Sequence, residues 1–144
     1  QAEILDVGCG CGVLALAALK LWPKSRAIAI DIDPEAVEVT QENTERNQLT
    51  ARMTTTTKRL QRIKEQVALQ FGNLTGPTLH LLCEDLVRHL RPGGVLIGSG
   101  ILTIESAGVI EAFTKRGLVL MDHIQEEEWS GILLQKPSEE GAGR

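Results

Sequence analysis

The chain has 144 residues and a mass of 15.7 kDa, with 42% hydrophobic and 24% charged residues, which predicts one globular domain with a sizeable core. Its net charge of −4 and its 3% of aromatic residues disfavour a basic or base-stacking nucleic-acid binder. Three cysteines are too few for a disulfide framework, and no apolar run reaches the roughly 18 residues that span a bilayer. We therefore expect reduced thiols in a cytoplasmic protein.

The first half of the sequence alternates between strand and helix patterns. An apolar, β-branched segment at the start is followed by three glycines within five residues, which predicts a buried strand that ends in a tight turn. Apolar residues at helical spacing then continue to Pro23, whose ring cannot extend a helix. We expect a strand over Glu3–Val7, a helix over Val13–Trp22, a strand over Ala27–Asp31 and a helix over Pro34–Arg46.

The second half is less regular. The threonines of Thr54–Thr57 favour a strand, and Lys58–Gln66 predicts a short polar helix or a loop. The remaining expected elements are a strand over Val67–Phe71, a helix over Thr78–Leu90, a turn at Arg91–Gly94, a strand over Val95–Ile97, a helix over Ser106–Arg116 with Gly117 as its left-handed cap, and strands over Leu118–Ile124 and Trp129–Leu134.

This alternation predicts an α/β fold with a doubly wound, mostly parallel sheet and a ligand at the carboxyl ends of the strands. The last two strands are joined by only a few residues, so they must pair as an antiparallel hairpin, with Glu126–Glu128 at its charged end. We expect residues 1–136 to form one domain and residues 137–144 to be a disordered tail, because no residue of the tail is apolar and larger than Ala or Pro.

A glycine-rich loop is the first chemical signal. It lies between the first expected strand and helix, where glycines allow a sharp turn and let a ligand approach main-chain N–H groups. A dinucleotide fingerprint would need its third glycine at position 13, which is Val13, and this argues against NAD and FAD. The loop reads Asp6-Val7-Gly8-Cys9-Gly10-Cys11-Gly12.

An acidic residue after the second strand is the second signal. Asp31 follows Gly12 by 19 residues and stands where a carboxylate accepts the two hydroxyls of a ribose, which favours a nucleoside ligand. The alternative is that Asp31 and Asp33 only cap the following helix. We assign the capping role to Asp33, which precedes Pro34, and the ligand role to Asp31.

These motifs, with Ile-Asp-Ile-Asp-Pro after the second strand, resemble a class I S-adenosylmethionine-dependent methyltransferase. The resemblance implies a Rossmann-like, seven-stranded sheet with an antiparallel last strand and S-adenosyl-L-methionine as the cofactor. It also implies a role for each site residue. Gly8, Cys9, Gly10 and Gly12 would lie along the methionine part, Asp31 would hold the ribose, Ile32 would pack on the adenine, and Asp6 would orient the loop or contact the methionine end through water.

Further motifs are similar to the catalytic domain of the PrmA family, which methylates amino groups of ribosomal protein eleven of the large subunit. They are Glu42-Asn43-x-x-x-Asn47, Gly72-Asn73-Leu74-x-Gly76-Pro77, Leu90-Arg91-Pro92-Gly93-Gly94, Ser99-Gly100-Ile101-Leu102 and Glu126-Glu127-Glu128-Trp129. The resemblance implies a ribosomal protein as the partner, with no membrane partner and no direct nucleic-acid binding. That family also carries an upstream recognition domain, whereas this sequence begins at the first expected strand.

Asn73 is the expected catalytic residue and a further cofactor contact, because its amide oxygen accepts a hydrogen bond from an amine and so directs the amine lone pair. The alternative is a buried loop Asn that satisfies nearby backbone groups. Ala68, Gln70 and Gly72 depart from the family pattern around this strand. A non-catalytic interaction domain and a methyltransferase acting on RNA or a small molecule remain the alternative functions.

Two other signals carry less weight. The cysteines and histidines lack the spacing of a tetrahedral metal site, so we expect no metal. The basic run Lys58–Lys64 is interpreted as a solvated surface rather than a contact for RNA or an acidic partner.

Overall fold

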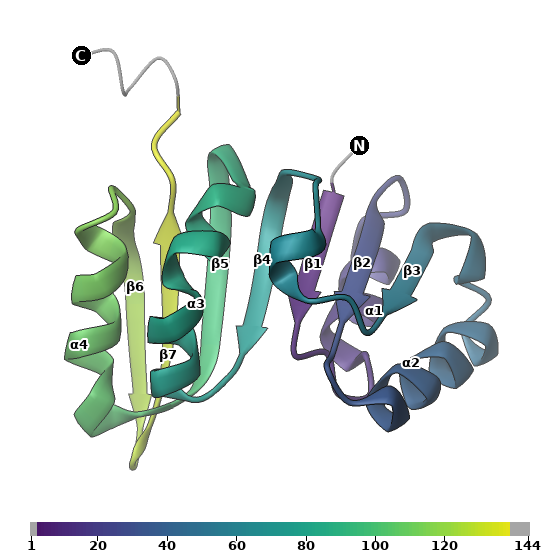
Figure 1. Cartoon of the computed structure of the whole chain (residues 1–144), viewed down its shortest axis with the longest axis horizontal. Coiled ribbons are helices and arrows are strands. Elements are labelled where there is room, and N and C mark those ends of the chain that lie inside the picture. Colours follow the sequence, from purple (N-terminus) through teal and green to yellow (C-terminus); the bar gives the residue numbers. More distant parts are fainter. Residues whose placement is uncertain (1–2, 139–144) are drawn as a thin grey trace.

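A seven-stranded sheet organises residues 3–138, which are the residues that the computed structural model describes (Figure 1). Its strand order is β3-β2-β1-β4-β5-β7-β6. The strands are β1 (Glu3–Val7), β2 (Arg26–Ile30), β3 (Met53–Thr56), β4 (Val67–Asn73), β5 (Leu90–Leu102), β6 (Val119–Glu126) and β7 (Trp129–Gln135).

The sheet is mixed, as the sequence predicts. Strands β3, β2, β1, β4 and β5 pair in parallel, whereas β7 runs antiparallel to both β5 and β6. The order reverses at β1, where Val7 lies between Ile30 of β2 and Gly72 of β4. Open parallel sheets bind ligands at the carboxyl ends of strands beside such a reversal, so the topology places the glycine loop at the expected position.

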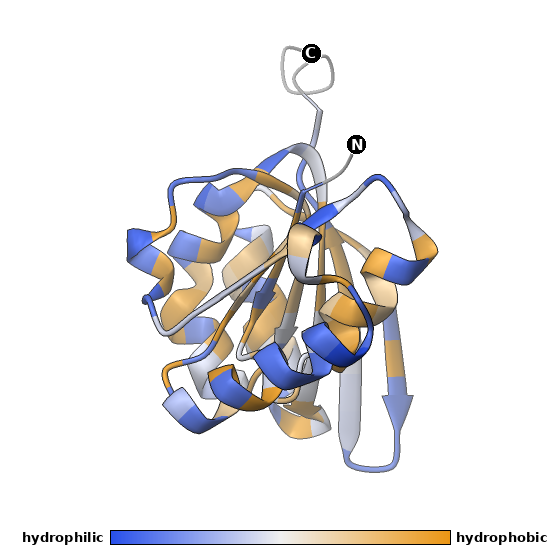
Figure 2. Ribbon diagram, turned by 90° about the vertical axis from the view of Figure 1, so that its right-hand side faces the viewer, coloured by the Kyte–Doolittle hydropathy of each residue, from blue (hydrophilic) through white to orange (hydrophobic). Residues whose placement is uncertain are grey.

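Helices cover both faces of the sheet and bury two separate cores. They are α1 (Val13–Leu21), α2 (Pro34–Arg46), α3 (Gly76–His89) and α4 (Thr103–Thr114), with short 3₁₀ turns η1 (Thr50–Arg52) and η2 (Leu60–Arg62). Neighbouring strand residues point to opposite faces, and accordingly Ile4 packs in the core beneath α1 while Leu5 packs in the core beneath α3 and α4. Figure 2 shows the apolar strands and inner helix surfaces between polar outer surfaces.

Every predicted helix and strand is present, and the differences lie at their ends. Helix α1 ends at Leu21, one residue early, because Trp22 precedes Pro23 and leaves the helical region, with φ −122° and ψ 89°. Helix α3 begins two residues early, at Gly76, because the Thr75 hydroxyl caps it by accepting the Thr78 N–H. Gly117 has φ +93°, as expected for the cap that follows α4.

Strand β5 is much longer than predicted. The Arg91–Gly94 turn lies inside it as an irregularity, which shifts the pairing with β4 between Val67 and Leu69. The Gly93 N–H donates to the Lys136 oxygen and the Lys136 N–H to the Gly94 oxygen, so the chain beyond β7 supplies hydrogen bonds for this turn. A Pro-Gly-Gly sequence therefore bends the strand without ending it.

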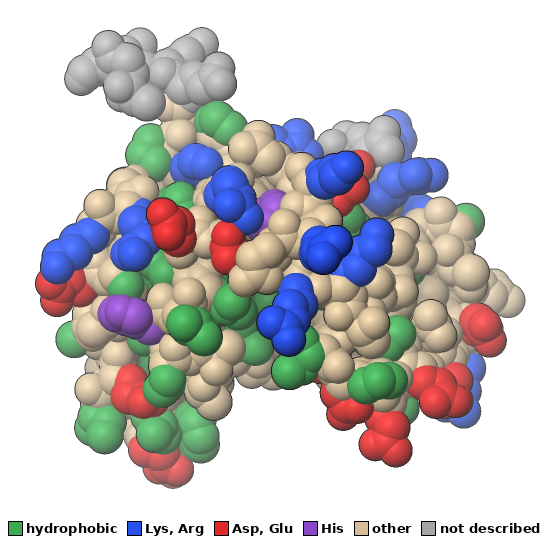
Figure 3. All heavy atoms as spheres, in the orientation of Figure 1, with side chains coloured by type: hydrophobic (Ala, Val, Ile, Leu, Met, Phe, Trp, Pro, Cys, Tyr) green, Lys and Arg blue, Asp and Glu red, His purple; other side chains and the backbone are tan. Residues whose placement is uncertain are grey.

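The connection between β3 and β4 is a loop that includes η2, within the range that the sequence left open. Leu60 and Ile63 anchor it in the core, and both ring nitrogens of the buried His89 lie within hydrogen-bonding distance of its carbonyl oxygens, those of Leu60 and Glu65. The basic residues of Lys58–Lys64 are all exposed, as predicted, and Figure 3 shows Lys and Arg side chains over the face that this connection crosses.

Within residues 3–138, no helix is long and apolar enough to cross a membrane, and no group of three His, Cys, Asp or Glu side chains could hold a metal ion. Pro137 and Ser138 have no regular secondary structure, and the rest of the expected tail lies outside the described residues.

Candidate functional site

The fold brings the sequence motifs together at the carboxyl ends of β1, β2, β4 and β5. The glycine loop turns directly after β1, with φ values of +74°, +57° and +84° at Gly8, Gly10 and Gly12. These are left-handed conformations that side chains disfavour, and they let the chain reverse into α1 within five residues. Asp31 follows β2, and Asn73 is the last residue of β4.

Asp31 is joined directly to the glycine loop. Its Oδ2 accepts the Gly10 N–H at 3.1 Å, and its Oδ1 accepts the Asp33 N–H at 3.0 Å. Asp33 is the N-cap of α2, and its carboxylate accepts the Glu35 N–H at 3.0 Å, as predicted. The two acidic residues therefore differ in structural role, because Asp33 caps a helix while Asp31 connects two binding motifs.

Two residues of helix α2, which the sequence did not predict as part of the site, donate hydrogen bonds to the backbone of the glycine loop. The Thr40 hydroxyl donates to the Gly10 oxygen at 2.8 Å, and the Asn43 amide donates to the Cys11 oxygen at 2.9 Å. A Cβ on Gly12 would lie 2.7 Å from Thr40 Cγ2, so the glycine is also needed for this close packing. The available signal was a polar Thr40 at helical spacing from the buried Val37.

Cys9 presents its side chain to the protein interior. Its thiol lies 3.5 Å from Thr40 Oγ1, and burial raises the pKa of Cys9 to about 11. The backbone N–H groups of Gly8 and Cys9 both donate to the Ile30 oxygen, at 2.9 and 3.0 Å. Closure of the turn thus uses the Gly8 and Cys9 N–H groups. Of the three loop glycines, Gly10 has an open Cβ position, because a Cβ on Gly8 would meet Leu74 and one on Gly12 would meet Thr40.

Asp6 is a buried carboxylate at the end of β1. The residue is 1% exposed, and neither carboxylate oxygen has a partner in hydrogen-bonding geometry among residues 3–138. Burial raises the pKa of Asp6 to about 6, the Ala15 N–H opposes this rise from the first turn of α1, and the charge of Asp31 adds to it. A carboxylate this deep, with only the Ala15 N–H to offset its burial, indicates a place where a polar or cationic ligand group, or a water that bridges to one, would bind.

We expect the free energy of unfolding to decrease as the pH rises, because of the Asp6 carboxyl group. Its pKa is about 6 in the folded chain against 3.8 ordinarily, so the folded state binds its proton more tightly. This stabilisation is complete below pH 3.8 and is lost as the pH rises through 6, a difference of about 3 kcal/mol. Denaturant unfolding at pH 4, 5, 6 and 7 should show Asp6→Asn removing most of this pH dependence.

The exposed variant Asp122→Asn is the control for this experiment, because Asp122 lies on the edge strand β6. A pH profile for Asp6→Asn that follows the profiles of the wild type and of Asp122→Asn would contradict the assignment.

Asn73 lies at the same edge but is not buried, contrary to the alternative that treated it as an internal loop residue. It pairs with Ser99 of β5, and the next N–H, that of Leu74, donates to the Ser99 oxygen at 3.1 Å. Its side chain is exposed and makes no hydrogen bond within residues 3–138. The amide is therefore available to a ligand or a substrate.

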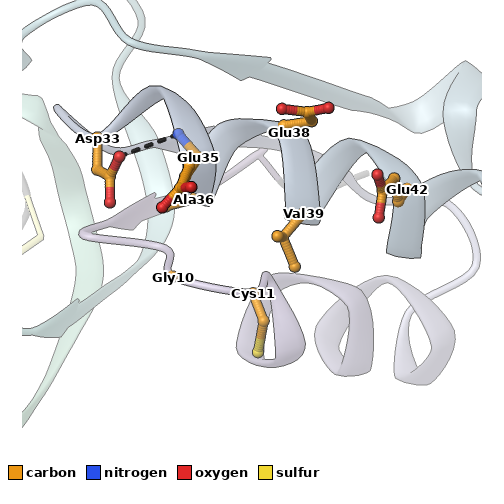
Figure 4. Close-up of a pocket in the computed structure, with 8 residues that line it drawn as sticks. All are labelled: Gly10, Cys11, Asp33, Glu35, Ala36, Glu38, Val39 and Glu42. Carbon is orange, nitrogen blue, oxygen red and sulfur yellow. Dashed lines mark hydrogen bonds between the residues drawn. The ribbon is translucent and has the colours of Figure 1, made fainter.

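A hollow of about 490 Å³ lies beside this edge, between α2 and the loop (Figure 4). Its wall includes Gly10 and Cys11 from the loop and several acidic side chains from the start and outer face of α2. It contains neither Asp31 nor Asn73, so it is a neighbouring groove. Ile32, expected to pack on a base, is 80% exposed just after β2.

These residues fit the methionine and nucleoside parts of S-adenosyl-L-methionine. At Gly10 the loop offers an open surface without a side chain, Asp31 lies beside Gly10 with a carboxylate suited to ribose hydroxyls, and the buried Asp6 carboxylate suits the amino end. The exposed Ile32 supplies an apolar surface. No metal or nicotinamide chemistry is needed to account for this donor set.

The strand order, the antiparallel β7, the loop after β1 and the acidic residue after β2 together define a class I methyltransferase fold. Solved structures support it. A ribosomal protein L11 methylase from Lactobacillus delbrueckii subsp. bulgaricus superposes with a TM-score of 0.86 at 25% identity, over 94% of this chain and 70% of that one. A precorrin-6y C5,15-methyltransferase from Geobacter metallireducens shares the fold with a TM-score of 0.79 at 15% identity, over 96% of this chain and 81% of that one.

Sequence comparisons narrow the class to a family. The family model "Ribosomal protein L11 methyltransferase (PrmA)" matches residues 1–137, so the chain belongs to that family. The ribosomal protein L11 methyltransferase of Geobacter metallireducens is 41% identical over 92% of this chain and 44% of its own length. The enzyme of that name from Chloroflexus aurantiacus is 36% identical over 94% of this chain and 48% of its own length. The chain thus spans less than half of these curated relatives.

Proposed function

We propose that this chain is the S-adenosyl-L-methionine-binding domain, residues 1–136, of a methyltransferase that modifies an amino group of a ribosomal protein. The observation that carries this proposal is the convergence of the glycine loop, Asp31 and Asn73 on one edge of a family-typical sheet. Relatives named as ribosomal protein L11 methyltransferases make that protein the first substrate to test.

In the proposed site, Asp31 accepts the ribose hydroxyls and Ile32 packs on the adenine. Gly8, Cys9, Gly10 and Gly12 line the methionine part, where Cys9 contributes backbone because its thiol faces Thr40. Asp6, which is 1% exposed, orients the loop or contacts the methionine end through a water. A cationic group beside Asp6 would favour its ionised form, so binding would lower the pKa that burial raises to about 6.

The bound cofactor would supply an electrophilic methyl group on a sulfonium, and its transfer is an in-line displacement that depends mainly on positioning. The obstacle is the proton on the amine. A lysine has a pKa of roughly 10.4, so pH 7 lies about 3 units below it, and removing the proton costs about 4 to 5 kcal/mol. Desolvation and a nearby positive charge both lower that pKa. Asn73 then accepts a hydrogen bond from the neutral amine and directs its lone pair.

Calorimetry with S-adenosyl-L-methionine and S-adenosylhomocysteine tests the cofactor, and transfer of a labelled methyl group to purified ribosomal protein L11 tests the reaction. Micromolar binding with methyl incorporation supports the proposal. Binding without incorporation would indicate a cofactor-binding interaction domain and overturn the catalytic part. No binding at millimolar ligand would overturn both parts for this chain.

A further inference from the structure

The segment Asn73–Leu74 lies between two glycines, one in the loop after β1 and one in β5. A Cβ on Gly8, in the loop after β1, would lie 2.6 Å from Leu74 Cδ2. A Cβ on Gly100, near the end of β5, would lie 2.8 Å from Asn73 Oδ1 and 3.4 Å from the Leu74 oxygen. Real Cβ atoms essentially never approach another heavy atom below 3.0 Å. Side-chain atoms of Leu74 and Asn73 therefore occupy the space that a Cβ at Gly8 or Gly100 would fill.

The Gly100 side of this arrangement is an irregularity in β5. The pairing of β5 with β7 shifts between Gly98 and Ile101, and Gly100 has φ +80°. Such bulges bend a strand and redirect the side chains next to it. Here the bulge turns the bare Cα of Gly100 toward Asn73, while the neighbouring Ser99 pairs with Asn73 and accepts the Leu74 N–H.

The Asn73 amide has no hydrogen-bond partner within residues 3–138 that would fix its orientation. Its backbone is held by the β4–β5 pairing, and its Oδ1 lies 2.8 Å from the position that a Cβ on Gly100 would take. The missing side chain of Gly100 thus leaves room for this oxygen at its observed place.

We propose that Gly100 is a positioning residue for the methyl transfer, because its missing side chain leaves the place in which the Asn73 amide lies. The proposal rests on the proposed role of Asn73. In Gly100→Ala, the new methyl group would push away the nearest movable atom, the end of a short side chain, while the backbone of Leu74 stays at ordinary contact distance. The variant should keep its fold and its cofactor site and lose the orientation of one amide.

Gly93→Ala is a matched control. Gly93 lies in the same strand with φ +83°, so alanine there meets nearly the same backbone strain as at position 100, yet a Cβ at Gly93 has no heavy atom within 4 Å. A loss of activity that comes only from a left-handed alanine would be equal in the two variants.

The test compares wild type, Gly100→Ala, Gly93→Ala, Asn73→Ala and the double variant Asn73→Ala/Gly100→Ala in single-turnover methyl transfer. We expect Gly100→Ala to slow transfer at least tenfold and Gly93→Ala to stay within twofold of wild type. In the Asn73→Ala background, adding Gly100→Ala should change the rate by less than twofold, because the two substitutions remove the same interaction. Equal rates for the two glycine variants, or losses that multiply, would overturn the proposal.

An NMR measurement keeps this outcome separate from that of the proposed function. The side-chain amide signals of Asn73 should shift in Gly100→Ala and not in Gly93→Ala, whether or not the chain transfers a methyl group. Unshifted amide signals would overturn the positioning role. If the wild type transfers no methyl group, the proposed function is overturned. The NMR comparison of the two glycine variants then still decides whether Gly100 positions the Asn73 amide.

Discussion

Replacing Asp31 with alanine is expected to weaken binding of S-adenosyl-L-methionine about 100-fold. The carboxylate lies beside the loop, where it accepts the Gly10 N–H, and in the proposed complex it accepts two ribose hydroxyls. Hydrogen bonds to a charged acceptor contribute about 1.5 kcal/mol or more each, and two of them amount to about 3 kcal/mol. Calorimetry on the purified variant measures this loss directly.

Asp33→Ala is the control for that experiment, because the same carboxyl group is removed two residues further along. Asp33 accepts the Glu35 N–H at the start of α2, so its loss should cost about 1 kcal/mol of stability and change the affinity less than threefold. Equal losses of affinity in the two variants would mean that Asp31 acts only through the turn before α2, and its ribose role would be withdrawn.

The alternation of strands and helices was predictable because each element has its own local signal. Pro23 ends α1, Pro34 with the Asp33 cap starts α2, and the short connection after Glu126 requires a hairpin. The ends of β5 were not predictable, since Arg91–Gly94 has the composition of a turn. What keeps it in the strand is the distant Lys136, whose backbone hydrogen-bonds with it.

The site likewise combines local features, which were predictable, with long-range contacts, which were not. Gly8, Gly10, Gly12 and Asp31 stand out because a sharp turn and a carboxylate after a strand are local features of the chain. The support around them is not local, since Thr40 reaches the Gly10 oxygen across 30 residues of sequence. The orientation of the Cys9 side chain was not predictable either, because a position within the loop does not indicate that the thiol faces α2.

Asn73→Ala is expected to lower the single-turnover rate of methyl transfer at least tenfold, a change of about 1.4 kcal/mol in the activation free energy. The side chain is exposed and makes no hydrogen bond within residues 3–138, so its removal should change the unfolding midpoint by less than about 3 °C. A slower reaction in an equally stable protein would locate the loss in the chemistry rather than in folding.

Binding of S-adenosylhomocysteine to the same variant separates the two contacts open to Asn73. Unchanged affinity with slower transfer would place the amide on the target amine, where it directs the lone pair toward the methyl group. Weaker affinity by a similar factor would place it on the methionine end, where it holds the donor in line. A single-turnover rate equal to that of the wild type would remove Asn73 from the mechanism, and the exposed amide at the end of β4 would then need another explanation.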